Sequence, residues 1–102
     1  MKKIRSIEVP LLARIWHEDD VWNVSAFDLP IVAYSENIED ARANFEEAVN
    51  SHFEALATLN RLESVAASLG SLAAQRGFYE ERVKPHTLVE SFLFHPMQDQ
   101  AA

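Results

Sequence analysis

Histidine, cysteine, serine and the acids do most of the chemistry in protein sites, and this 102-residue chain has four histidines, sixteen acids and no cysteine. The densest run of such residues is His17, Glu18, Asp19 and Asp20. Consecutive residues in a tight turn point in different directions, so we interpret this run as a solvated hairpin turn and predict no metal site. Ser25 and Ser35 have no histidine in a recognisable nucleophile arrangement, which leaves nucleophilic catalysis unsupported.

Nuclease chemistry through metal ions would need several acids that converge on one point. Asp28, at the end of a predicted strand, is the single acid in a suitable place. Glycine occurs only at positions 70 and 77, too sparsely for a phosphate-binding loop. His52 falls in the apolar stripe of a predicted helix, where we interpret it as a core or interface histidine rather than a pH switch. We therefore predict a protein that is not an enzyme and holds no cofactor.

The charge of the chain points to its class of partner. The net charge is −7, and residues 18–63 carry −9 while residues 1–17 carry +3. Such a surface repels a phosphate backbone and attracts a basic protein, so we expect no direct binding of nucleic acid. The longest uncharged run, residues 64–75, is too short to span a membrane. We expect a soluble, cytoplasmic protein.

The predicted strands follow from alternating or β-branched segments. In residues 7–17 apolar side chains recur at every second position, which predicts a strand with one covered face. Residues 21–27 and 31–34 predict two further strands, each after a turn, so that the three form a meander. Since Pro10 has no N–H to donate, we expect either that the paired strand begins near Leu11 or that Pro10 lies at a bulge or edge. Residues 87–95 predict a fourth strand, and residues 97–102 are expected to fray.

A long helix should begin near Ile38, where Ser35 or Asn37 can cap its first turn. Its apolar stripe predicts the buried face, which comprises Ile38, Ala41, Phe45, Ala48, Val49, His52, Leu56 and Leu59. A short second helix over residues 62–69 should end at Gly70 in a left-handed conformation. The predicted fold is a single α+β domain, residues 1–102: an antiparallel meander of three to four strands packed against one long helix, with a short second helix.

The strand face turned away from the long helix carries Leu12 and Trp16, and Tyr34 lies on the same face of its strand. Together they would form an exposed apolar patch, which predicts a symmetric homodimer or a higher homo-oligomer. The alternative is that the C-terminal segment folds back over the same residues within one chain.

Two segments resemble the HicB-like antitoxin family: residues 21–30 (VWNVSAFDLP) and residues 35–48 (SENIEDARANFEEA). Residues 62–70 also resemble the short second helix of some HicB-like chains, so the resemblance covers about residues 9–70. Ile31 replaces the glycine that usually follows the proline, and Ser35 with Asn37 replace a Gly-x-Thr pair. Many family members carry a C-terminal DNA-binding motif, and residues 71–102 show none, so operator binding does not carry over.

The resemblance implies a partial ribonuclease H-like fold that binds rather than catalyses. It implies a function as an antitoxin-like protein that neutralises a small basic toxin of the HicA type, which cleaves messenger RNA. The acids near the sheet and its turns are our candidates for the partner surface: Glu18, Asp19, Asp20, Asp28 and Glu36. A stand-alone homo-oligomeric module and a small-ligand sensor are the alternatives without a toxin.

Overall fold

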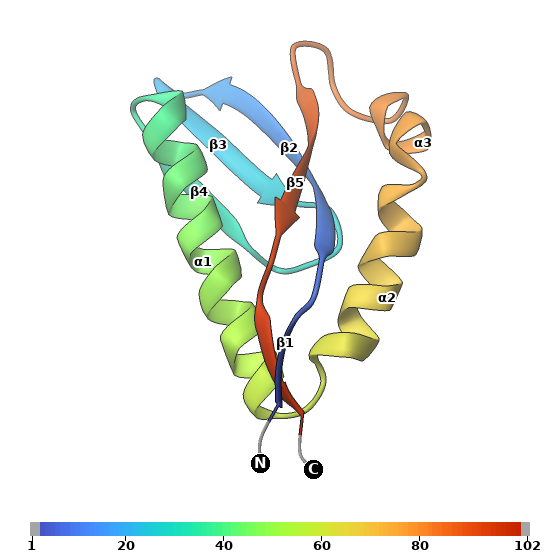
Figure 1. Cartoon of the computed structure of the whole chain (residues 1–102). Coiled ribbons are helices and arrows are strands. Elements are labelled where there is room, and N and C mark those ends of the chain that lie inside the picture. Colours follow the sequence, from blue (N-terminus) through green and yellow to red (C-terminus); the bar gives the residue numbers. More distant parts are fainter. Residues whose placement is uncertain (1–2, 101–102) are drawn as a thin grey trace.

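The computed structural model describes residues 3–100 and has the α+β architecture that the sequence predicts. Four strands form an antiparallel sheet in the order β4-β3-β2-β5, and a separate two-stranded ribbon pairs β1 with β6 (Figure 1). The strands are β1 (Lys3–Ser6), β2 (Val9–Glu18), β3 (Val21–Ala26), β4 (Val32–Ser35), β5 (Leu88–Phe94) and β6 (Met97–Gln100). The helices are α1 (Ile38–Thr58), α2 (Leu62–Ala73) and α3 (Arg76–Glu80).

The β2–β3 hairpin is closed by two residues. Glu18 pairs with Val21, and Asp19 and Asp20 between them have φ of 54° and 64°. Two central residues with positive φ are typical of a type I′ turn, whose twist matches that of the flanking strands. The prediction of a hairpin turn here is confirmed.

Pro10 lies inside β2, opposite Leu93 of β5. β3 pairs with β2 only from Ala13 onward, so at Pro10 β2 has one neighbouring strand and a side that tolerates the missing N–H. The alternative that the paired strand begins near Leu11 is wrong, because Val9 and Pro10 already pair with β5, and the structure shows Pro10 at an edge instead.

The expectation that the tail frays is wrong for residues 97–100. They form β6 and pair with β1 from Lys3 opposite Gln100 to Ser6 opposite Met97. The Ile7 N–H then donates to the Pro96 carbonyl at 2.9 Å, which joins the ribbon to the β2–β5 pair. Residues 101 and 102 of the predicted tail lie outside the described residues.

Helix α1 begins at Ile38 as predicted, and of the two candidate caps it is Asn37 whose side-chain oxygen accepts the Asp40 N–H, at 2.8 Å. At its other end Asn60 adopts φ 58°, its N–H donates to the Ala57 carbonyl, and the Arg61 N–H donates to the Leu56 carbonyl. These two bonds and the left-handed residue form a Schellman motif.

The buried line of α1 differs from the predicted stripe. Its fully buried residues advance in steps of four: Ala41, Phe45, Val49 and Phe53. Each step of four turns the helix by about 40°, so the contact line drifts around the helix as it crosses the twisted sheet. As a result Phe53 is buried, His52 is only half-buried, and Ala48 and Leu59 are exposed. The prediction that His52 lies in the core is wrong.

Glycine does not end the second helix. α2 continues through Gly70 to Ala73, no glycine has a positive φ, and Gly77 lies inside α3. The extension follows from a single apolar face, because the buried residues Leu62, Ala66 and Leu69 continue into the half-buried Ala73 at helical spacing.

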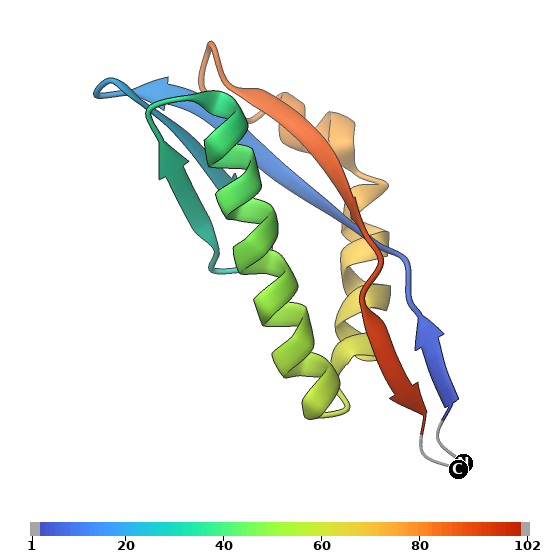
Figure 2. The ribbon, with the colours of Figure 1, turned by 60° about the vertical axis from the view of Figure 1, so that its left-hand side comes forward.

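The sheet lies between α1 on one side and α2 with α3 on the other (Figure 2). On the first side, Leu11 pairs with Phe92, whose ring lies 5.2 Å from that of Phe45 in α1. On the second side, the Arg14 guanidinium lies over Phe27, which in turn contacts Tyr79 of α3. Alternate residues of β2 therefore face different layers.

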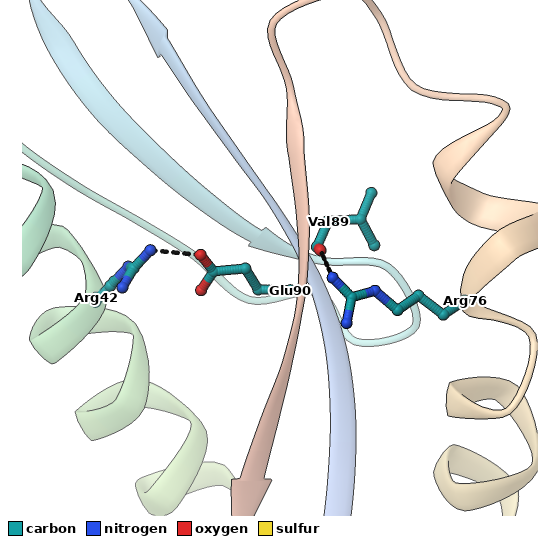
Figure 3. Close-up of polar contacts among 4 residues, drawn as sticks. All are labelled: Arg42, Arg76, Val89 and Glu90. Carbon is teal, nitrogen blue, oxygen red and sulfur yellow. Dashed lines mark hydrogen bonds and ion pairs between the residues drawn. The ribbon is translucent and has the colours of Figure 1, made fainter.

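Two arginines hold the edge strand β5 from opposite sides (Figure 3). Arg42 of α1 forms an ion pair with Glu90, and Arg76 of α3 donates to the Val89 carbonyl at 2.7 Å. The Arg76 bond satisfies a carbonyl of an edge strand, and such groups otherwise offer a template for pairing with another chain. One edge of the sheet is therefore partly protected by its own chain.

Candidate functional site

The structure brings together four of the five acids that the sequence nominated. Glu18, Asp19 and Asp20 form the β2–β3 turn, and Glu36 follows β4. Because Trp22 pairs with Ser35, that turn and the start of α1 lie at the same end of the sheet. Asp28 follows β3 and lies at the opposite end.

The first turn of α1 adds two acids, Glu39 and Asp40, at this end. Glu39 is not among the acids that the sequence nominated, because the pairing of β3 with β4 that places the helix start here is not visible in local periodicity. We name the group the acidic end. It comprises Glu18, Asp19, Asp20, Glu36, Glu39 and Asp40.

All six residues of the acidic end are exposed. Two of them accept a hydrogen bond from a neighbouring side chain. The Trp16 Nε1–H donates to Glu18 at 3.2 Å, and the Asn37 amide donates to Asp40 at 3.1 Å. None of them forms an ion pair with another side chain among residues 7–97. The negative potential of this end is therefore not cancelled by close ion pairs, although Glu18 also lines a hollow that contains Arg14, Arg82 and Lys84.

Asp28 has a different environment. The Tyr79 hydroxyl donates to its carboxylate at 3.3 Å, and the Tyr79 ring lies 4.7 Å from that of Phe27. Desolvation raises the pKa of the Tyr79 hydroxyl above its usual value, and the Asp28 charge raises it further. These contacts join α3 to the loop after β3, so the structure gives Asp28 a packing role in that loop.

The predicted apolar patch is divided. Leu12 is only 2% exposed, so it is covered within one chain; it alternates with Leu11, which faces α1, and therefore lies on the side of α2 and α3. Trp16 is half-buried, whereas Tyr34 is 68% and its neighbour Val32 is 61% exposed. Both exposed residues belong to β4, the other edge strand of the sheet. Tyr34 lies on the same face as Trp16, as predicted, because Asn23 pairs with both residues, but the open apolar surface is confined to the edge strand.

A hollow of about 330 Å³ lies beside β2, at the small end of the range of ligand pockets. β2 supplies Arg14, Trp16 and Glu18, and the segment between α3 and β5 supplies Arg82, Val83, Lys84 and Thr87. We name it the cationic hollow, because its lining has three cations and one carboxylate. Sequence reasoning missed it: the segment 81–87 has no periodicity, and only its position over β2 brings Arg82 and Lys84 to Arg14.

No protein-family model matches this sequence, and the searches of curated proteins and of solved structures likewise return no match. Among the residues that the structure describes, no group of three or more histidines and acids could hold a metal ion. Within the same residues, no helix is long and apolar enough to cross a membrane.

Proposed function

We propose that this chain is a binding protein of the antitoxin type, which captures a small basic toxin through the acidic end. The observation that carries the proposal is the gathering of six exposed carboxylates, none of them in an ion pair with another described side chain, where two turns and a helix start meet. A protein that binds and cleaves RNA must present lysine and arginine to the phosphates. An acidic surface of matching size would occupy the same groups.

The edge strand β4 gives the proposed surface an apolar anchor. β4 leads directly into the turn that carries Glu36, and its exposed Val32 and Tyr34 lie beside an unpaired row of backbone groups. An extended segment of a partner can add to such an edge by backbone hydrogen bonds. Charge would then set the rate of encounter, while the edge would set the lifetime of the complex.

The test uses the product of any small basic reading frame next to this gene. Reversal of two charges, Asp19→Lys with Asp20→Lys, should slow association and flatten its salt dependence. The matched control reverses Glu47 and Glu54, which are exposed on α1 at a distance from the acidic end. Both double variants change the net charge equally, so only the position of the charge differs.

A second pair of substitutions separates charge from turn stability. Asp19→Asn with Asp20→Gly removes two acids but supplies the residues that a type I′ turn favours. We expect a protein that is at least as stable and yet associates more slowly. Equal association rates for the wild type and all three double variants would contradict the proposal, as would the absence of a small basic neighbour that binds.

The homo-oligomeric alternative is favoured by the exposed Val32 and Tyr34 alone. Two copies could pair β4 with β4 antiparallel about a two-fold axis. That arrangement would place the acidic ends of the two copies apart, because each follows β4 in opposite directions. It predicts association that does not depend on a basic partner.

A further inference from the structure

The cationic hollow exists because β2 is longer than its neighbour on that side. The pairing of β2 with β5 stops at Ile15 opposite Leu88, so Trp16 and Glu18 extend beyond the start of β5. The segment 81–87 crosses this overhang before the chain enters β5 at Leu88. The hollow is the space between the overhang and that segment.

Aromatic rings position two of its cations. The Arg14 guanidinium lies 5.8 Å from the Trp16 ring centre and 5.3 Å from that of Phe27, and it forms no ion pair in the described range. Arg82 stacks on Phe78 at 3.5 Å and donates to the Phe78 carbonyl at 2.9 Å. Aromatic rings position these guanidinium groups without neutralising them.

Glu81, which lies outside the lining, and the remaining charged residues of the lining complete the charge balance. Glu81 approaches Arg82 only at 4.0 Å, and both side chains are exposed. Lys84 forms no ion pair with a described residue. Glu18 supplies the one carboxylate of the lining and also accepts the Trp16 indole N–H. The lining therefore carries a surplus of two positive charges in a chain whose net charge is −7.

We propose that the cationic hollow binds a small phosphate monoester attached to a flat ring, a ligand of the nucleoside monophosphate class. A phosphate dianion matches the local surplus, and guanidinium and ammonium donors form charge-assisted hydrogen bonds with its oxygens. Thr87 adds a hydroxyl, and the indole of Trp16 offers a surface on which a flat ring can stack. The size of the hollow admits one such molecule.

The surrounding charge favours a small ligand over a nucleic acid. Glu18 at one boundary of the hollow belongs to the acidic end, and Asp19 and Asp20 follow it directly. A polynucleotide would bring further phosphates against these acids, which costs affinity, whereas a single phosphate meets only the local surplus. The same acids that would attract a basic protein therefore limit what the hollow accepts.

Adenosine monophosphate is the probe, and the two indole N–H signals in an NMR titration are the readout. Trp16 lines the hollow, while Trp22 contacts His17 on the other side of the sheet and serves as an internal control. We expect the Trp16 signal to shift and the Trp22 signal to stay. Adenosine and inorganic phosphate should each bind at least about tenfold more weakly, because each offers half of the contacts.

Lys84→Gln tests the charge of the lining, and Arg61→Gln, an exposed residue of the turn between α1 and α2, is its matched control. Lys84→Gln should weaken binding about tenfold, the loss of one charge-assisted hydrogen bond, and Arg61→Gln should not. Arg14→Gln should act like Lys84→Gln. Indoleacetate, a flat-ringed carboxylate, should bind more weakly than adenosine monophosphate.

Three results would overturn the inference. They are an unmoved Trp16 signal at millimolar nucleotide, equal affinity in Lys84→Gln and Arg61→Gln, and a single-stranded RNA that binds the same residues more tightly than the mononucleotide. The variant Asp19→Asn with Asp20→Gly should keep nucleotide binding. A failure of the partner proposal would therefore leave this result unchanged, and the two proposals fail separately.

Discussion

Phe53 is the residue on which the packing of α1 depends most at its C-terminal half. Its side chain is 0% exposed, and its ring meets that of Phe94 in β5 edge to face at 5.6 Å. Truncation by Phe53→Ala removes the transfer free energy of the ring and leaves a cavity, which together cost about 3–5 kcal/mol. At about 4–8 °C per kcal/mol for a domain of this size, the midpoint of thermal unfolding should fall by roughly 12–40 °C.

Urea unfolding measures this cost in a set of three variants. Phe53→Leu keeps most of the volume and should cost under about 1.5 kcal/mol, so it reports on the same site while the protein stays folded. His52→Ala removes the neighbouring half-buried side chain and should cost under about 1 kcal/mol. The expected order of urea midpoints is wild type, His52→Ala, Phe53→Leu, Phe53→Ala.

Equal urea midpoints for His52→Ala and Phe53→Ala would refute the reasoning. That result would mean that α1 contacts the sheet through the stripe predicted from the sequence, on which His52 faces the sheet. A change in the slope of the transition without a change in midpoint would point to the unfolded state instead.

Three further predictions follow from local contacts. In a Tyr34→Phe background Tyr79 is the single tyrosine, so tyrosinate absorbance reports its titration alone. The pKa of Tyr79 should lie above about 10, and Asp28→Asn should lower it. Because the folded state raises that pKa, the stabilisation it represents is complete below pH of about 10 and is lost as pH rises through the folded pKa; an unshifted titration would contradict this. Asn60→Ala should cost about 1–2 kcal/mol in urea unfolding, since φ is 58° there, whereas Asn60→Gly should cost nothing; equal stabilities would exclude strain at this position. Light scattering should show twice the 11.6 kDa of one chain if β4 edges pair, and Tyr34→Lys should halve that mass; a single-chain mass for the wild type would remove the homodimer.

Local signals in the sequence predicted the parts of the fold that depend on neighbours in the chain. The Asn37 cap, the burial of Phe45 and the turn at Asp19 each follow from residues within a few positions of one another. The β2–β3–β4 meander follows for the same reason, because each connection is short.

The parts that escaped prediction depend on distant segments. β1 and β6 pair across almost the whole chain, and their polar composition gives no periodic signal. Phe53 rather than His52 is buried because the twist of the sheet, and not the helix alone, sets the contact line. Glycine at positions 70 and 77 is tolerated because tertiary packing of α2 and α3 overrides the local preference to stop.

The candidate site divides in the same way. The acids of the β2–β3 turn were visible in the sequence, and Glu39 joins them only through the register of β3 with β4. Arg82 and Lys84 gave no signal, because their importance comes from the overhang of β2 beneath them.

The pairing of β1 with β6 determines how this molecule would respond to a pulling force. Both described ends, Lys3 and Gln100, lie opposite each other at one end of the ribbon, and the other end of the ribbon joins the sheet (Figure 1). A force that separates them loads the ladder one residue pair at a time, since the hydrogen bonds of antiparallel strands lie across the strand direction. The ribbon would open first, then the Ile7–Pro96 bond, then the β2–β5 pair from Val9 onward. The acidic end, at the far end of the sheet, would be the last part of the molecule to feel the load.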